Sequence, residues 1–249
     1  MKIVYSLSVF LAFCCLGAFY SCDNLTSDDR LPNVFDEDSH NVFTEHARDS
    51  VKTEKESSSF EDLVATYENK NRVFWQKPDL IIDRMGDIST KTVADIGAGS
   101  GYFARRLAHK AKKVIAVDID ERFIEFMDSI KLVELPSELQ DRFVTRLATP
   151  KDSNLDESEA DIIILVNTYI YIADPVPYLD HLRTRLSPGG KVVIVDFKKK
   201  RIPISNPPAS LRVPLYKVED ALDAAGYKKI ESDDTSLDYQ YIVVASPTE

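Results

Sequence analysis

The sequence predicts an α/β protein with a doubly wound, seven-stranded and mostly parallel sheet that ends in an antiparallel C-terminal strand. Three observations lead to this fold class. Short apolar runs alternate with segments of helical periodicity between about residues 92 and 197. A glycine-rich turn joins the first apolar run to the first helical segment after it. Two runs near the C-terminus are separated by a loop too short for a crossover helix, so they must pair antiparallel.

The first strand and the turn after it carry the most information. Residues 93–103 read V-A-D-I-G-A-G-S-G-Y-F, with the acid Asp95 at the end of the apolar run and glycines at 97, 99 and 101. Glycine reaches positive φ and lets a ligand approach the backbone closely. The helix that follows offers unpaired N–H groups. A dinucleotide-binding site has the spacing G-x-G-x-x-G, and the diphosphate of its ligand rests on the start of the helix. The observed spacing and the carboxylate of Asp95 instead favour a ligand with a positive group.

The remaining elements follow from periodicity. Helical patterns at about 60–74 and 80–85 are expected to cover the ligand side of the sheet. The unbroken apolar run at 161–167 indicates a central strand buried on both faces, and residues 187–190 read as a turn. The other expected strands are 92–96, 114–118, 142–147, 191–197, 228–232 and 239–245, and the other expected helices are about 101–110, 121–133, 174–186 and 218–225.

Charge and composition exclude several functions. The formal net charge of −10 argues against nucleic acid as a main partner, because such sites need clustered Lys and Arg. The basic run at 198–201 is more typical of a solvated loop. All three cysteines lie within the first 22 residues, so no disulfide, thiol nucleophile or cysteine-based metal site is expected in the domain. The four histidines show no H-x-x-x-H spacing, so no metal is expected.

The N-terminus has the composition of a targeting segment. Residues 1–21 contain one lysine followed by a long uncharged, mostly apolar stretch, which predicts a signal peptide. The segment resembles a bacterial lipoprotein signal with Cys22 as the lipidated residue, which predicts a membrane-anchored protein of the cell envelope. An uncleaved anchor helix is the alternative, since such a stretch can just span a bilayer. Residues 22–59 are acidic and poor in apolar residues, so we expect a disordered tether.

The motif at 93–103 resembles motif I of the class I S-adenosylmethionine (SAM)-dependent methyltransferases, which have a Rossmann-like sheet. The antiparallel C-terminal end is similar to that family as well, so residues 60–249 are expected to form a methyltransferase-like domain. The resemblance implies roles for the residues at the strand ends. The methionyl part of SAM would lie on Asp95, Gly97, Ala98, Gly99 and Gly101, the ribose on Asp118, the adenine on Ile119 and Asp152, and the sulfonium near Asn167.

The expected function is methyl transfer from SAM to a small-molecule acceptor. Such transfer depends mainly on alignment of donor and acceptor and on exclusion of water. Asn167 and Tyr171 are the candidate catalytic residues, and the segment 196–198 is expected to line the acceptor side. Many similar methyltransferases carry histidines where this chain has Ile170 and Tyr171. An exported binding or scaffold protein without turnover is the alternative, because SAM is a cytoplasmic metabolite. A nicotinamide oxidoreductase is disfavoured by the glycine spacing.

Overall fold

The computed structural model describes residues 59–247 of the chain. The predicted signal peptide, Cys22 and the predicted tether up to residue 58 lie outside the described residues. Within residues 59–247, no helix combines the length and apolar character needed to cross a bilayer.

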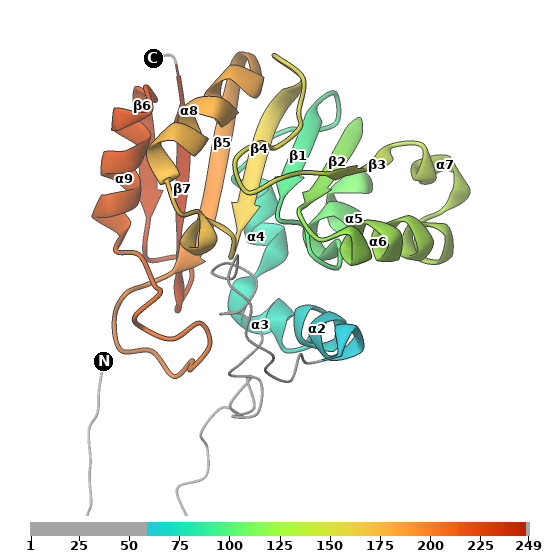
Figure 1. Ribbon diagram of the computed structural model, residues 1–249, viewed down its shortest axis with the longest axis horizontal. Coiled ribbons are helices and arrows are strands. Elements are labelled where there is room, and N and C mark those ends of the chain that lie inside the picture. The colour runs from blue at the N-terminus through green and yellow to red at the C-terminus, as the bar shows by residue number, and fades with distance from the viewer. Residues whose placement is uncertain (1–58, 248–249) are drawn as a thin grey trace, which may run out of the picture. The chain divides into compact units, whose positions relative to one another are not determined.

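Residues 59–247 contain one seven-stranded sheet with the order β3-β2-β1-β4-β5-β7-β6 (Figure 1). β7 runs antiparallel to both of its neighbours, β5 and β6, whereas the remaining pairs are parallel. The strands are β1 (Thr92–Ile96), β2 (Lys113–Asp118), β3 (Phe143–Leu147), β4 (Ala160–Val166), β5 (Leu186–Phe197), β6 (Lys229–Asp233) and β7 (Gln240–Ser246). The predicted fold class is therefore confirmed, including the antiparallel C-terminal strand.

The helices cover both faces of this sheet because successive strand residues point to opposite sides. In β4, Ile162 and Ile164 pack with α4, α5 and α6, whereas Ile163 and Leu165 pack with α8 and α9. The central strand is thus buried on both faces, as its apolar run predicts. The helices are α2 (Phe60–Tyr67), α3 (Arg72–Gln76), α4 (Pro78–Asp83), α5 (Tyr102–Ala108), α6 (Glu121–Glu134), α7 (Ser137–Gln140), the 3-10 helix η2 (Tyr169–Tyr171), α8 (Pro175–Arg185) and α9 (Leu215–Ala224).

Two elements differ from the expectations. The helix expected over 60–74 is divided into α2 and α3, and Lys77 adopts φ +49 between α3 and α4, where Pro78 begins the next helix. β5 begins at Leu186 rather than at Lys191, so the residues expected to form a turn lie inside the strand as a bulge. Gly190 allows this bulge, because a Cβ there would lie 2.8 Å from the backbone oxygen of Ser187.

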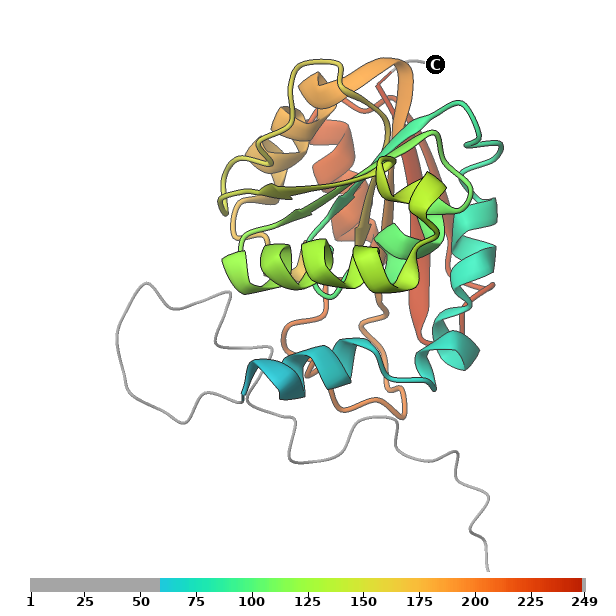
Figure 2. The same cartoon turned by 90° about the vertical axis from the view of Figure 1, so that its right-hand side faces the viewer.

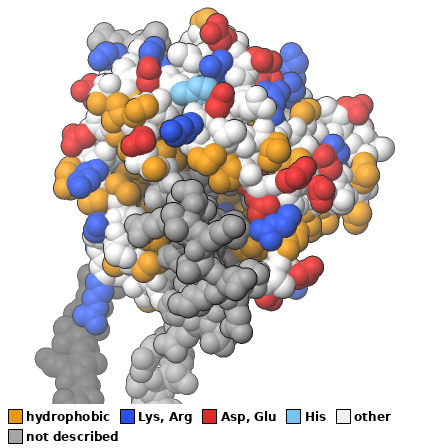
Figure 3. Space-filling model, viewed as in Figure 1, with side chains coloured by type: hydrophobic (Ala, Val, Ile, Leu, Met, Phe, Trp, Pro, Cys, Tyr) orange, Lys and Arg blue, Asp and Glu red, His pale blue; other side chains and the backbone are white. Residues whose placement is uncertain are grey.

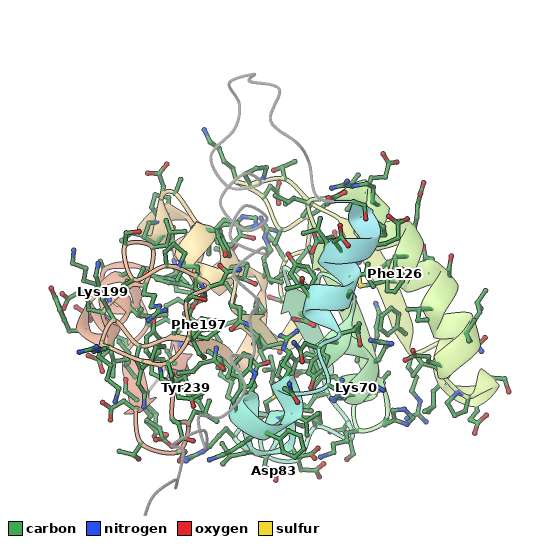
Figure 4. The ribbon with its side chains drawn as sticks, turned by 90° about the horizontal axis from the view of Figure 1, so that it is seen from below. Lys70, Asp83, Phe126, Phe197, Lys199 and Tyr239 are labelled. Carbon is green, nitrogen blue, oxygen red and sulfur yellow. The ribbon has the colours of Figure 1, made fainter. Side chains whose placement is uncertain are left out.

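Helix α2 lies across the lower end of the sheet in Figure 1 and below α6 in Figure 2. Its first turn is closed by a capping box between Ser59 and Asp62. Aromatic contacts attach the helix to α6, with ring centroids 5.0 Å apart for Phe60 and Phe123 and 5.2 Å apart for Tyr67 and Phe123. Figure 4, seen from below, shows α2 crossing this end of the sheet. The helix therefore forms one wall of the region beyond the strand ends.

Candidate functional site

A cavity of about 510 Å³ lies at the carboxyl ends of β1, β2 and β4. This is where the strand order reverses, the usual ligand position in an open α/β sheet. Its volume falls within the range of roughly 300–1,000 Å³ that is typical of small-molecule sites. The lining includes Leu63, Tyr67, Arg72, Gly97, Ala98, Gly99, Asp118, Ile119, Ala148, Asn167, Thr168, Tyr171, Ile172, Pro177 and Tyr178.

The glycine turn forms one side of the cavity. Gly97, Ala98 and Gly99 line it, and both glycines have positive φ, at +72 and +54. A Cβ on Gly97 would lie 2.5 Å from Oγ1 of Thr168, and a Cβ on Gly99 would lie 2.8 Å from the ring of Tyr67. The turn therefore needs glycine at both positions so that two side chains of the cavity wall can approach it.

Gly101 differs from its expected role, because it does not line the cavity. It is the N-cap of α5 with φ +80. A Cβ there would meet the side chain of Met127 at 3.2 Å and that of Phe143 at 3.7 Å, both in the core. The third glycine therefore serves the packing of α5 against α6 and β3 rather than a ligand.

Asp95 also differs from its expected role. It is 2% exposed and lies behind the turn, outside the cavity lining. It accepts a hydrogen bond from the backbone N–H of Ala104, in the first turn of α5. Its Oδ2 has no hydrogen-bond partner among residues 59–247. Burial raises its pKa to about 7, opposed by the positive charge of Arg72. The carboxyl group thus holds the helix start in place and does not face the cavity.

Asp118 lies in the cavity wall as expected. Its Oδ2 accepts a hydrogen bond of 2.8 Å from the Gly99 N–H, and its Oδ1 accepts one of 3.0 Å from the Asp120 N–H. Burial raises the pKa of this carboxyl group. The backbone N–H of Ile119 also donates to this carboxylate, so backbone groups fill three of its acceptor positions and one remains for a hydroxyl group of a ligand. Ile119 beside it lines the cavity and is 48% exposed, which leaves an apolar surface for a flat ligand.

Asp152 lies outside the lining, in contrast to its expected place on the adenine. Its side chain is 61% exposed and its Oδ1 lies 3.2 Å from Nε2 of His181. Asp152 belongs to a tight turn, in which the backbone N–H of Thr149 donates to its carbonyl at 2.9 Å. This turn directs the Asp152 side chain away from the cavity. Residues 148–151 line the cavity in its place.

The end of β4 contributes Asn167, Thr168 and Tyr171 to the lining. Asn167 has φ +58, a left-handed conformation that asparagine tolerates better than most residues. Burial raises the pKa of Tyr171 and of Tyr67 far above that of a free tyrosine. Both hydroxyl groups therefore stay protonated at neutral pH, and neither can act as a general base. Tyr169 is buried in the core on the other side of the sheet.

The segment expected on the acceptor side, 196–198, supports the site from behind. Asp196 is fully buried, and its carboxylate accepts from the Phe197 N–H at 2.7 Å and from the Ile170 N–H at 3.2 Å. It thereby anchors η2, which carries Tyr171. Lys198 donates to the carbonyl of Leu237 at 2.6 Å. None of the three side chains lines the cavity, and Figure 4 shows Phe197 on the opposite side of the view from Phe126 of α6.

Three cavity residues, Leu63, Tyr67 and Arg72, come from the N-terminal helices and carry no sequence signal that marks them as site residues. Tyr67 covers Gly99, as described above. Arg72 has its guanidinium carbon 4.2 Å from the centroid of the Tyr102 ring and donates from Nη1 to the Tyr67 carbonyl at 3.0 Å. Burial lowers the pKa of Arg72 to about 10, so it remains charged at neutral pH. The cavity therefore contains a buried positive group.

Positive and negative side chains are interspersed over the face seen in Figure 3. Within residues 59–247, no group of three or more histidine, cysteine or acidic side chains has the arrangement of a metal site. The polar part of the cavity lining consists of a backbone turn, the acids Asp118, Asp120 and Asp174, the bases Arg72 and Lys151, the amide of Asn167, and hydroxyl-bearing side chains such as those of Tyr67, Tyr171 and Tyr178.

A family model described as a methyltransferase domain matches residues 68–232. The chain belongs to this family. The match covers the cavity from Arg72 to Tyr178 and confirms the family resemblance of residues 93–103 at the level of the methyltransferase domain.

Individual relatives are more distant. An uncharacterised methyltransferase of Mycobacterium bovis is 27% identical over 139 residues, which are 56% of this chain and 52% of the relative. The chain thus spans about half the length of the curated relatives it matches. A SAM-dependent methyltransferase structure from Aquifex aeolicus superposes with a TM-score of 0.67 at 19% identity, over 76% of this chain and 98% of that one. A Haemonchus contortus phosphoethanolamine N-methyltransferase with bound S-adenosylhomocysteine superposes with a TM-score of 0.58 at 15% sequence identity, over 77% of this chain and 61% of that one.

Proposed function

We propose that this protein transfers a methyl group from SAM to a small-molecule acceptor. The observation that carries the proposal is the cavity at the strand reversal, in which the Asp118 carboxylate is fixed by the N–H of Gly99. This places a two-oxygen acceptor next to an exposed backbone turn, which suits a ligand that has both a diol and a compact polar end. Membership of the methyltransferase domain family supports the same activity.

The residues present fit the cofactor, with changes to the expected set. Gly97, Ala98 and Gly99 would hold its amino-acid part, Asp118 its ribose and Ile119 its adenine face. Arg72 adds a positive charge suited to a carboxylate. Gly101, Asp95 and Asp152 do not face the cavity and are left out of the proposed contacts. When bound, the cofactor supplies a methyl group on a positively charged sulfur.

The acceptor half of the cavity is largely apolar and aromatic, with Tyr171, Ile172, Pro177 and Tyr178 in its wall. Such a wall excludes water and favours an acceptor with a flat or apolar body. Since Tyr67 and Tyr171 remain protonated, they can donate hydrogen bonds but do not remove a proton. The protein's contribution is therefore alignment, with Asn167 and Tyr171 nearest the reacting region.

Calorimetric titration of the full chain with SAM, S-adenosylhomocysteine and NADH tests the cofactor. We expect both sulfur nucleosides to bind and NADH not to bind. Transfer of labelled methyl from SAM to a panel of hydroxylated aromatic compounds then tests turnover. Binding of the nucleosides without transfer to any acceptor of the panel would favour the scaffold alternative, and binding of NADH alone would contradict the proposal.

We also propose that the chain is exported and anchored at the cell envelope through a lipid on Cys22, on the basis of the composition of residues 1–22. Labelling with radioactive palmitate in a bacterial host tests this, with Cys22→Ala as the matched control. Label on the wild type and none on the variant is expected. An unlabelled wild type would contradict lipidation and leave the anchor helix as the explanation for any membrane fraction.

A further inference from the structure

Three amide side chains, far apart in sequence, meet behind the cavity wall. Gln76 of α3 and Gln240 of β7 are both fully buried. Nε2 of Gln76 donates to Oε1 of Gln240 at 3.0 Å and to Oδ1 of Asn167 at 3.3 Å. Nε2 of Gln240 donates to the same Oδ1 of Asn167 at 2.5 Å. Arg72 donates from Nε to Oε1 of Gln76. These contacts tie α3, β4 and β7 together at one point.

The orientation of each amide follows from the arginine at the start of the series. A guanidinium group can only donate, so the atom of Gln76 that faces Arg72 must be its oxygen. Its nitrogen is then directed at Gln240 and Asn167. Gln240 receives that donor on its oxygen, so its own nitrogen also points to Asn167. Asn167 must meet both donors with its oxygen, which leaves its NH₂ group on the side of the cavity that it lines.

We propose that Arg72, Gln76 and Gln240 form a one-directional hydrogen-bond relay that makes Asn167 present a donor, and not an acceptor, to the ligand. Gln76 and Gln240 are then positioning residues that do not touch the ligand. The consequence for the ligand rests on the proposed function. The group that meets Asn167 carries an oxygen that accepts a hydrogen bond, either the carboxylate of the cofactor or an oxygen of the methyl acceptor.

The backbone at Asn167 supports a functional constraint. Its φ of +58 is uncommon for a residue other than glycine, and such conformations cluster at functional sites when surrounding contacts hold them. The two hydrogen bonds to Oδ1 are such contacts. A donor at this position also repels the ammonium group of the cofactor, because two donors cannot pair. The relay therefore discriminates between the two charged ends of an amino-acid group.

The substitution Gln76→Glu inverts the relay with little change of shape. Its carboxylate keeps the contact with Arg72 and gains an ion pair, but it offers only oxygen to Gln240 and Asn167. Gln240 must turn its nitrogen toward residue 76, and Asn167 must turn its nitrogen toward Gln240. The oxygen of Asn167 then faces the cavity. Asn167→Asp gives the same result directly, because both of its side-chain atoms accept.

Gln140→Glu is the matched control, because it makes the same chemical change in α7, outside the cavity lining. The side chain of Gln140 donates to the carbonyl of Leu135 at 3.0 Å. Side-chain amide exchange in nitrogen-labelled full chain, followed by NMR, reads the orientation without any ligand. The NH₂ signal that is lost in Asn167→Asp identifies Asn167.

In the wild type we expect the Asn167 NH₂ to exchange with solvent faster than those of the two buried glutamines. In Gln76→Glu we expect the Asn167 NH₂ to become protected from exchange with solvent. In Gln140→Glu we expect its exchange rate to stay as in the wild type. An Asn167 NH₂ that is as protected as the glutamines in the wild type, or that is unchanged in Gln76→Glu, would overturn the relay.

Ligand binding identifies the source of the accepting oxygen. We expect Gln76→Glu and Asn167→Asp each to weaken one ligand by roughly tenfold and Gln140→Glu to weaken none. If the variants bind S-adenosylhomocysteine more weakly but bind methylthioadenosine, which lacks the amino-acid group, as the wild type does, then the accepting oxygen belongs to the cofactor carboxylate. If the variants, saturated with S-adenosylhomocysteine, bind para-nitrophenolate more weakly than the wild type does, then the accepting oxygen belongs to the methyl acceptor. If neither ligand is weakened, the proposed role of the donor is wrong. A wild type that binds no sulfur nucleoside contradicts the proposed function, while the exchange measurement still decides the relay.

Discussion

The ends of β1 and β5 each bury a carboxyl group, and the two differ in how their oxygens are used. Burial raises the pKa of both Asp95 and Asp196 to about 7. At the end of β5, each oxygen of Asp196 accepts from a backbone N–H, that of Phe197 or that of Ile170. At the end of β1, Asp95 accepts from the Ala104 N–H, and its Oδ2 has no hydrogen-bond partner within residues 59–247.

The comparison shows that a raised pKa does not by itself identify a ligand-binding acid. Both groups lie at strand ends, where ligands bind in this fold, and both titrate near neutrality. Neither lines the cavity. The hydrogen-bond inventory separates them, since Asp196 anchors the turn that carries Tyr171, whereas Asp95 holds a helix start and interacts with Arg72. Asp118 does line the cavity, and its carboxylate keeps an acceptor position that its backbone partners do not fill.

The largest expected effect comes from replacing each buried acid by asparagine. Asp196→Asn turns an NH₂ group toward a backbone N–H, whereas Asp95→Asn can place its NH₂ at the unpartnered position. Both substitutions replace a buried acid whose pKa is raised to about 7, so the change from acid to amide has a similar cost in the two variants and cancels in the comparison. We expect Asp196→Asn to be less stable than Asp95→Asn by roughly 1–3 kcal/mol, the cost of one buried unsatisfied donor. Urea unfolding followed by circular dichroism measures the difference. Equal stabilities would mean that the turn of η2 does not depend on Asp196.

The next effect concerns Asp118, which lines the cavity. Asp118→Ala removes both acceptor oxygens and leaves the Gly99 N–H without its partner. We expect affinity for S-adenosylhomocysteine to fall by about tenfold to a hundredfold, since a charge-assisted hydrogen bond contributes roughly 1.5–3 kcal/mol. Calorimetry measures the loss, and Asp95→Asn is the control with an acid outside the cavity. A larger loss in the control would return Asp95 to the ligand-binding role.

The two halves of the cavity also differ in how far the sequence predicts them. The glycine turn follows from a local pattern, because a strand that ends in a tight turn fixes its own geometry within a few residues. The places of Asp118 and Ile119 follow from the family resemblance. The succession of strands and helices and the burial of the central strand on both faces follow from apolar periodicity. Within the motif, Gly101 and Asp95 lie outside the cavity lining. The alternate glycine spacing does not show which glycine faces the ligand and which faces the core.

The other half depends on contacts between distant segments. Gln76, Asn167 and Gln240 meet across three elements, and the sequence marks only Asn167 as a site residue. Asp196 was expected beside the acceptor because it ends a strand, but its carboxylate accepts from the N–H of Phe197 and from that of Ile170 in η2, which has no sequence pattern of its own. Tyr67 ends α2 and Arg72 begins α3, so the two cavity residues stand on either side of a break in the helical segment expected over 60–74. Local reasoning therefore identified the cavity and missed the residues that orient its contents.

A smaller effect is expected in the pH dependence of stability. The pKa of Asp95 is about 3.9 in the unfolded chain and about 7 in the fold. Between these values the unfolded carboxyl ionises while the folded one keeps its proton, so its stabilising contribution is present at low pH and lost as pH rises to about 7. We expect Asp95→Asn to reduce the decline in unfolding free energy by about 1 kcal/mol per pH unit between about pH 5 and pH 7.

This window avoids the acids that titrate lower, such as Glu159, whose pKa is lowered to about 2 by its hydrogen bond to Arg146. Urea unfolding at several pH values gives the slopes. Asp196→Asn should flatten the curve by a similar amount, because its raised pKa has the same cause and size. A variant whose unfolding free energy falls with pH as steeply as that of the wild type would show that the replaced carboxyl stays ionised in the fold. For Asp95, this result would mean that the charge of Arg72 outweighs the effect of burial on its pKa.

The smallest effect distinguishes the family resemblance from the observed geometry. The resemblance places Asp152 on the adenine, whereas the structure directs it toward His181 and outside the cavity. Asp152→Asn should therefore change the affinity for S-adenosylhomocysteine by less than about twofold, well under the loss expected for Asp118→Ala. Calorimetry of both variants with adenosine as a second ligand isolates the adenine contact. If Asp152→Asn loses the same factor of affinity for adenosine as for S-adenosylhomocysteine, then the loop at 148–152 turns inward when a nucleoside binds. Asp152 would then contact the ligand only in the bound state.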